Sequence, residues 1–195
     1  YPGITVSVST GNSQDVLERL LDYRADVGVL AQFSRDRRFV ALPYSEHPVV
    51  LLVPADHRLG RRRSIRTAEL RGEPLIMREQ GSTTRKAFEA ALKAAQVEPK
   101  IVMEIGSREI IREAVLQGIG LAAVSEVEVV PGPGLHTVRL ADADAARDGR
   151  LDRGIVEIQR RRADRGAICC HRAGQLPHRG ALGIHLLPRD RILPE

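Results

Sequence analysis

The sequence predicts an α/β fold with a mostly parallel sheet and helices on its faces. Two observations lead to this prediction. Short apolar runs rich in β-branched residues alternate with segments whose apolar residues recur at helical spacing. At three places a glycine and small hydroxyl residues stand between a run and the helix that follows it. The order strand, glycine turn, helix, strand is typical of parallel sheets.

The first 54 residues contain the first such unit. Residues 4–8 alternate apolar and polar side chains, which predicts a strand with one buried face. A helix follows the turn at residues 11–13, and residues 26–30 predict the second strand. The stripe that predicts the helix consists of Val16, Leu17, Leu20 and Leu21. A third apolar run, residues 49–53, precedes Pro54.

The same order recurs twice after a polar connection. Residues 55–71 include Arg61, Arg62 and Arg63 and predict a surface segment with a short helix near residues 67–70. His57 is expected to shape a turn in it. Strands are predicted at residues 75–77, 100–105 and 121–124, and helices over about residues 85–95 and around residues 110–115. Gly118 suits the left-handed residue that ends the second of these helices.

Charge divides the chain into two unlike parts. The 195 residues have 30 Lys and Arg against 25 Asp and Glu, a net charge of +5. Residues 1–145 hold 19 basic and 19 acidic side chains, so the remaining 11 basic and 6 acidic ones in residues 146–195 carry the whole excess. A high pI therefore does not indicate a nucleic-acid surface on the main body.

Composition excludes several classes of protein. The hydrophobic content of 43% excludes a wholly disordered chain, and two cysteines exclude a disulfide-rich scaffold. No run reaches the roughly 20 apolar residues of a membrane-spanning helix, so no membrane partner is expected. Because residue 1 is Tyr and not Met, we expect the chain to be a fragment of a longer protein.

The three glycine turns are the candidate binding elements. In an open parallel sheet such turns gather at the carboxyl ends of the strands, where ligands bind. Each turn ends at a helix N-terminus, whose unpaired N–H groups and partial positive charge favour a carboxylate or a phosphate-like group. The residues concerned are Gly11, Asn12, Ser13, Gly81, Ser82, Thr83, Thr84, Arg85 and Ser107.

Each candidate has a second, structural interpretation. Ser13, Thr84 and Ser107 can simply cap their own helices, although the recurrence of the pattern at three turns argues for a shared role. Arg85 can contact an oxyanion with both arms of its guanidinium, or it can be a solvated surface residue.

Patterns for catalysis and metal binding are not found. The sequence has no phosphate-binding loop, no zinc-protease motif and no nucleophile elbow. Residues 118–123 superficially match a dinucleotide fingerprint, but they lie at a helix end before a strand, which is the wrong context. His47 and His57 have no local partners for a metal. We therefore expect no enzyme, no cofactor and no metal.

The body resembles the effector-binding domain of LysR-type transcriptional regulators. The resemblance covers about residues 1–140, and the ordered series of segments is more specific than any one motif. The matching segments are residues 1–20, 26–29, 47–59, 70–76, 78–85 and 114–122. Residues 78–85 (Arg-Glu-Gln-Gly-Ser-Thr-Thr-Arg) and 123–126 (Ala-Val-Ser-Glu) also resemble the branch associated with aminoethylphosphonate catabolism.

The resemblance implies two Rossmann-like subdomains, like type II periplasmic binding proteins, with a small anionic effector in the cleft between them. It implies homodimers or tetramers, a cytoplasmic location, and DNA binding only through an N-terminal helix-turn-helix that this chain lacks. Residues 1–52 correspond to part of subdomain I and residues 53–145 to subdomain II. The resemblance implies effector contacts at Thr10 to Ser13 in the first subdomain and at Ser82, Thr83 and Ser107 in the second. A ligand-dependent shift between arrangements of subdomains or dimers would then control transcription.

The chain departs from this family pattern at both ends. The first strand and helix of the family's domain would precede Tyr1. Residues 146–195 form an atypical basic tail where the family returns to subdomain I with a strand and a last helix. Residues 155–158 and 182–187 are its apolar runs, and Cys169 and Cys170 lack the spacing of a zinc site. A reading-frame change near residue 146 and a disordered basic extension are both open interpretations.

Two other functions were weighed against ligand sensing. A solute-binding transport protein has the same architecture but needs export. An enzyme needs a base beside a nucleophile, and the candidate turns supply hydroxyls without an evident base.

Overall fold

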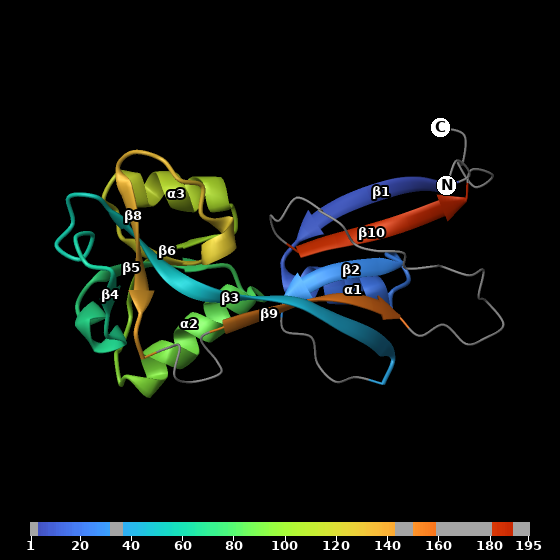
Figure 1. The fold of residues 1–195 in the computed structure, drawn as a ribbon, viewed down its shortest axis with the longest axis horizontal. Helices are drawn as coiled ribbons and strands as arrows, with labels where there is room; N and C mark the ends of the chain where they lie inside the picture. Colours follow the sequence, from blue (N-terminus) through green and yellow to red (C-terminus); the bar gives the residue numbers. More distant parts are fainter. Residues whose placement is uncertain (1–3, 32–36, 143–149, 159–180, 189–195) are drawn as a thin grey trace. The chain divides into compact units, whose positions relative to one another are not determined.

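The computed structural model describes residues 4–31, 37–142, 150–158 and 181–188. The chain divides into two compact units, unit 1 with residues 1–45 and 153–195 and unit 2 with residues 46–152. Strand β3 (Phe39–Pro54) runs through the first boundary and strand β9 (Arg150–Ile158) through the second (Figure 1). Because the chain passes between the units inside strands, no turn or linker marks these boundaries in the sequence. Our sequence-based boundaries lie at residues 52 and 145.

In its described residues, unit 1 consists of a small sheet with α1 (Ser13–Leu21) packed against it. Its strands have the order β1-β10-β2-β9, and each neighbouring pair is antiparallel. β1 and β2 therefore point the same way, with β10 between them, and α1 connects them. The elements not yet bounded are β1 (Ile4–Gly11), β2 (Val27–Ala31) and β10 (Ala181–Pro188).

The core of unit 1 depends on a close approach of α1 to β2. Val16 and Leu20 of α1 are fully buried with Ala25 and Leu30. A Cβ at Gly28 would lie 2.9 Å from side-chain atoms of both Val16 and Leu20. Glycine at this position thus lets the helix stripe that the sequence predicts settle directly on the sheet.

Unit 2 contains most of the described secondary structure. Its main strand order is β3-β7-β5-β6, and β8 pairs with β3 and with β4. The elements are β4 (Ser64–Ile65), η1 (Thr67–Leu70), β5 (Pro74–Arg78), α2 (Thr83–Ala94), β6 (Lys100–Ile105), α3 (Arg108–Leu116), β7 (Leu121–Ser125), η2 (Glu126–Glu128) and β8 (Leu135–Leu140).

The centre of unit 2 is the parallel trio β7-β5-β6, with α2 and α3 on opposite faces (Figure 1). The side chains on the α3 face form one buried cluster, which includes Val50, Ile76, Ile111, Ala122 and Val124. On the other face lie Leu75 and Phe88, both almost fully buried. Since the trio is parallel, the carboxyl ends of its three strands meet at one edge of the sheet.

The α/β fold with two units is as predicted, but the sheet is mixed where we expected it to be mostly parallel. Parallel pairing occurs in the trio and between β4 and β8. The strands that pass between the units, β3 and β9, pair antiparallel with β7 and β2. These two strands run opposite to their neighbours and are not part of βαβ units. The repeated strand-helix pattern in the sequence therefore does not predict their antiparallel pairing.

Two details of the connections are confirmed. Gly118 has a φ of +69° and ends α3. The Leu59 N–H donates to His57 Nδ1 at 3.3 Å, so His57 shapes its turn.

The apolar runs at residues 155–158 and 182–187 form parts of β9 and β10. Cys169, Cys170 and the other tail residues outside these two strands (146–149, 159–180 and 189–195) lie outside the described residues.

Candidate functional site

The β5–α2 turn of unit 2 carries half of the predicted site residues. Gly81 has a φ of +83°, a left-handed conformation that favours glycine. Ser82 is the N-cap of α2, and its Oγ accepts from the Arg85 N–H at 3.5 Å. The first intrahelical bond runs from the Lys86 N–H to the Ser82 carbonyl at 3.1 Å. Thr83 and Thr84 fill the first two helical positions and are buried.

This cap leaves donors available at the start of α2. A capping Oγ uses an acceptor lone pair, so the Ser82 hydroxyl keeps its own proton for another partner. The N–H groups of Thr83 and Thr84 belong to the first turn, which has no intrahelical acceptors for them. A small anion at this point would therefore meet one O–H and two N–H donors.

Arg85 is not the solvated surface residue that was one of the two interpretations of this position. Its side chain is 9% exposed, which excludes a solvated surface residue. Nε donates to Glu89 at 2.7 Å, and Nη1 donates to the Arg78 carbonyl at 2.8 Å and to Glu104. The hydrogen bond to Glu104 is the main cause that raises the pKa of Arg85.

These contacts make Arg85 a clamp. It joins the first turn of α2 to the last residue of β5, through the Arg78 carbonyl, and to β6, through Glu104. The positive charge of the Arg85 guanidinium is paired with the carboxylates of Glu89 and Glu104. Direct contact of Arg85 with an effector stays a prediction, and the contacts that are present support a role in holding the turn.

At the start of α3, Ser107 is a cap whose proton is already engaged. Its Oγ accepts from the Ile110 N–H at 3.3 Å and donates to Glu109 Oε2 at 2.9 Å. Glu109 also places a carboxylate in the first helical turn, where it offsets the positive end of the helix. The capping interpretation therefore describes Ser107 in this structure.

The corresponding turn of unit 1 is satisfied by its own residues. Asn12 caps α1: its Oδ1 accepts from the N–H groups of Gln14 and Asp15, both at 3.0 Å. The Asn12 N–H donates to Asp15 Oδ2 at 3.2 Å, which completes a capping box. The buried Ser13 is not the cap. Its Oγ accepts from the Ala31 N–H at 3.3 Å and so ties α1 to the end of β2.

The two remaining candidates of unit 1 belong to β1. Thr10 is exposed and pairs with Leu182 of β10, and Gly11 is the last residue of the strand. A Cβ at Gly11 would lie 3.0 Å from the Asp15 Cβ, so glycine leaves room for the capping box.

The three helix N-termini differ in the charge of their first turns. Asp15 stands in the first turn of α1 and Glu109 in that of α3, whereas the first turn of α2 has no acidic residue. Among the three α-helices that the structure describes, α2 thus has the N-terminus best suited to an anion.

A buried charge network borders this edge of unit 2. Arg78 donates to both carboxylate oxygens of Glu79, at 2.8 and 2.9 Å. Glu128 is buried between Arg78, at 3.8 Å, and Arg108, at 3.1 Å. Sequence reasoning missed these pairs, and the one available signal was an arginine at the end of a strongly apolar strand, since buried charges are paired.

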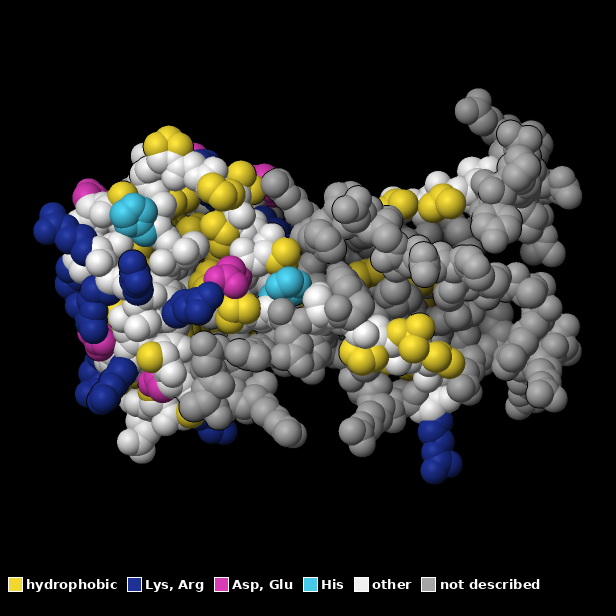
Figure 2. Space-filling view, in the orientation of Figure 1, with side chains coloured by type: hydrophobic (Ala, Val, Ile, Leu, Met, Phe, Trp, Pro, Cys, Tyr) yellow, Lys and Arg dark blue, Asp and Glu magenta, His cyan; other side chains and the backbone are white. Residues whose placement is uncertain are grey.

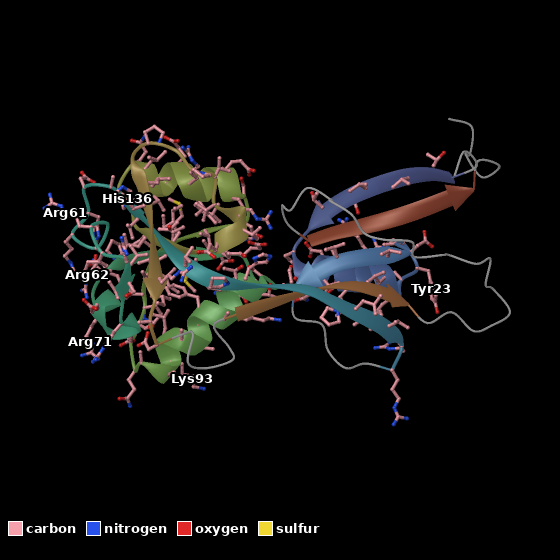
Figure 3. The ribbon with its side chains drawn as sticks, viewed as in Figure 1. Tyr23, Arg61, Arg62, Arg71, Lys93 and His136 are labelled. Atoms are coloured by element: carbon pink, nitrogen blue, oxygen red, sulfur yellow. The ribbon has the colours of Figure 1, made fainter. Side chains whose placement is uncertain are left out.

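A basic face lies away from this edge. Side chains of Lys and Arg gather around β4 on the surface of unit 2 (Figure 2). Arg61, Arg62 and Arg71 project outward there (Figure 3). Arg62 pairs with Glu69, and Arg58 pairs with Glu73. The surface connection that the sequence predicts at residues 55–71 is thus confirmed as an exposed, arginine-rich segment.

The described residues contain neither a membrane-spanning helix nor a metal-binding cluster. None of the helices there is long and apolar enough to cross a membrane. Within the same ranges, no cluster of three or more His, Cys, Asp or Glu side chains could hold a metal ion.

Comparison with known proteins identifies the class. The model of the LysR substrate binding domain matches residues 1–165. The HTH-type transcriptional activator CmpR of Synechocystis sp. (strain ATCC 27184 / PCC 6803 / Kazusa) is 35% identical over 137 residues, which cover 68% of this chain and 45% of CmpR. The chain thus spans less than half the length of this relative.

Solved structures show the same fold. The regulatory domain of Synechocystis PCC6803 CcmR, solved in complex with 2-PG, has a TM-score of 0.71 at 24% identity and covers 81% of this chain and 76% of its own. The effector binding domain of QuiR in complex with shikimate has a TM-score of 0.68 at 12% identity, with 77% and 70% covered.

The fold is that of a periplasmic-binding-protein-like α/β domain with two units. The chain belongs to the LysR substrate-binding domain family, the effector-binding part of LysR-type transcriptional regulators.

Proposed function

We propose that this chain binds a small anionic metabolite at the start of α2 and that binding modulates transcription by the whole regulator. One observation carries the proposal. The N-terminus of α2 combines a serine cap with a free donor proton, two unpaired N–H groups and a first turn without carboxylates.

The surroundings favour a small ligand over a polyanion. The Arg78, Arg85 and Arg108 side chains at this edge all pair with glutamates, so they add no large positive field. Recognition then depends on a few short hydrogen bonds to one anionic group, as in pockets with a small number of placed polar groups. Ser13 supports the same chemistry in unit 1, because its Oγ accepts from Ala31 and keeps its proton.

We further propose that the whole protein is a non-enzymatic regulator located in the cytoplasm, that it forms dimers or tetramers, and that it binds DNA through a helix-turn-helix outside this chain. The names of the relatives support this proposal, since CmpR is an HTH-type transcriptional activator. They favour regulation over the solute-binding alternative. The resemblance to the aminoethylphosphonate branch makes a phosphonate one specific candidate for the ligand.

Isothermal titration calorimetry tests the proposal. The chain is titrated separately with 2-aminoethylphosphonate, 2-PG and shikimate. We expect saturable binding of at least one of them, and a loss of affinity of roughly tenfold or more in Ser82→Ala, because one hydrogen bond to a charged group contributes about 1.5–3 kcal/mol.

Ser64→Ala is the matched control, since Ser64 is an exposed serine of β4 in the same unit. It should bind like the wild type. Absence of binding for all three compounds would contradict the proposed function. Binding of another compound but not of 2-aminoethylphosphonate would remove the phosphonate from consideration.

A further inference from the structure

Ser125 is the exceptional hydroxyl of unit 2. It ends β7, it is 0% exposed, and its Oγ has no hydrogen-bond partner among the described residues. It occupies the N-cap position of η2, yet its side chain makes no capping bond. A buried polar atom without a partner is rare in native proteins and calls for a physical explanation.

Three other buried hydroxyls do have hydrogen-bond partners. Ser13 accepts from the Ala31 N–H, and Ser82 accepts from the Arg85 N–H. Thr67 donates to Asp142 Oδ1 at 2.7 Å. Among the described residues, Ser125 Oγ is the one hydroxyl oxygen that is fully buried and has no hydrogen-bond partner.

The register of the sheet puts Ser125 beside the α2 turn. β7 runs parallel to β5, with Leu121 opposite Leu75 and Ala122 opposite Ile76. If this register continues to the strand ends, β5 and β7 end at the same edge of the sheet. Ser125 therefore lies at the edge where β5 leads into the turn that contains Ser82.

The alternation of side chains along β7 indicates which face of the sheet carries the Ser125 side chain. Ala122 and Val124 pack in the cluster with α3, so Ser125, one residue further on, points to the opposite face, which α2 covers. The orphaned hydroxyl and the start of α2 thus share both an edge and a face of the sheet.

We propose that Ser125 donates a hydrogen bond to the bound anion, so that Ser125 and Ser82 together recognise a carboxylate, phosphate or phosphonate group. This inference rests on the proposed function. The hydroxyl has a donor and two acceptor lone pairs, and since none of them is engaged by a described residue, a hydrogen bond to the anion breaks no contact of the hydroxyl with those residues. The unpaired Ser125 hydroxyl then lowers the stability of the fold, and it is retained because the same hydroxyl binds the ligand.

This role makes an unusual combined prediction for Ser125→Ala. Removal of an unsatisfied buried hydroxyl relieves the ligand-free protein, so the melting temperature should stay the same or rise by roughly 2–4 °C. The affinity for the anion should fall about tenfold. Ser125→Cys keeps nearly the same size but has only a weak donor, and it should lose affinity to a similar extent.

Thr67→Val is the matched control, since it removes a buried hydroxyl of the same unit that does have a partner. It should lower the melting temperature and leave the affinity unchanged. Calorimetry with 2-aminoethylphosphonate, 2-PG and shikimate, together with thermal unfolding monitored by circular dichroism, measures both quantities for the wild type and the variants.

The outcomes separate this inference from the proposed function. A wild type that binds one of the three compounds, with Ser125→Ala weaker by about tenfold, supports both. Equal affinity of the wild type and Ser125→Ala overturns the role of Ser125, for example because a water molecule satisfies its Oγ, and leaves the proposed function standing. A wild type that binds none of them overturns the proposed function, and the inference falls with it.

Discussion

Replacement of Arg85 distinguishes a residue that holds the site from one that contacts the ligand. Arg85→Ala removes three contacts at once: those to Glu89, to Glu104 and to the Arg78 carbonyl. Both carboxylates are nearly half exposed, so each pair contributes about 0.5–1 kcal/mol. The carbonyl loses one charged donor, a further ~1–1.5 kcal/mol.

These terms predict that Arg85→Ala lowers the free energy of unfolding by roughly 2–3.5 kcal/mol. At about 2–4 °C per kcal/mol for a chain of this size, the melting temperature falls by about 4–14 °C. Arg85→Lys should lose about half as much, since an ammonium cannot reach three acceptors with a planar fork. Part of the difference should disappear in 1 M NaCl, because half-exposed ion pairs are screened.

Denaturant unfolding followed by circular dichroism measures these differences, with Arg61→Ala as the control for an exposed arginine. That variant should remain within about 0.5 kcal/mol of the wild type. If Arg85→Ala is no less stable than Arg61→Ala, the clamp is refuted. If Arg85→Lys keeps most of the stability but loses all ligand binding, Arg85 contacts the ligand directly.

Three further changes have predictable effects. Gly28→Val should lower the free energy of unfolding by about 1–3 kcal/mol in chemical denaturation, because its side chain would overlap the buried stripe of α1. Gly81→Ala should cost about 1–2 kcal/mol at its φ of +83° and should also weaken anion binding in calorimetry. Burial tends to raise the pKa of Asp142, but hydrogen bonds from Thr67 outweigh it and lower the pKa below its ordinary value of 3.8. The stabilisation by the ionised form is thus complete above that pH and disappears as the pH falls through the lowered pKa. The stability difference between the wild type and Asp142→Asn, about 1 kcal/mol or less, should therefore shrink in acid titrations below pH 4.

Local patterns in the sequence predict the parts of the fold that local physics determines. The predicted ends of β5, α2, β6 and β7 lie within two residues of the observed ones, and α3 contains the predicted apolar stripe, because apolar periodicity and glycine turns agree there. By contrast, the sequence does not predict β8, and the first ten residues of β3 contain Pro43 and Pro48, which usually argue against a strand. Pairing across the sheet decides both of these elements.

Side-chain partners explain what the sequence could not show about the site. The recurrence of hydroxyl turns located the starts of all three α-helices, but not which residue caps each one. Asn12 and Ser82 are the caps where Ser13 and Thr84 were considered. Nor does sequence spacing reveal that Arg85 meets Glu104, 19 residues away, or that the Ser125 Oγ has no hydrogen-bond partner among the described residues. Those facts depend on which strand lies beside which.

The serines that follow the parallel strands of unit 2 also affect how this fold can change in evolution. Ser82 and Ser107 occupy N-cap positions, which accept serine, threonine, asparagine and aspartate with similar helix stability. A substitution there can replace a hydroxyl by an amide or a carboxylate while the backbone stays in place. Related domains can therefore acquire new ligands, even cationic ones, by single changes that leave folding almost untouched.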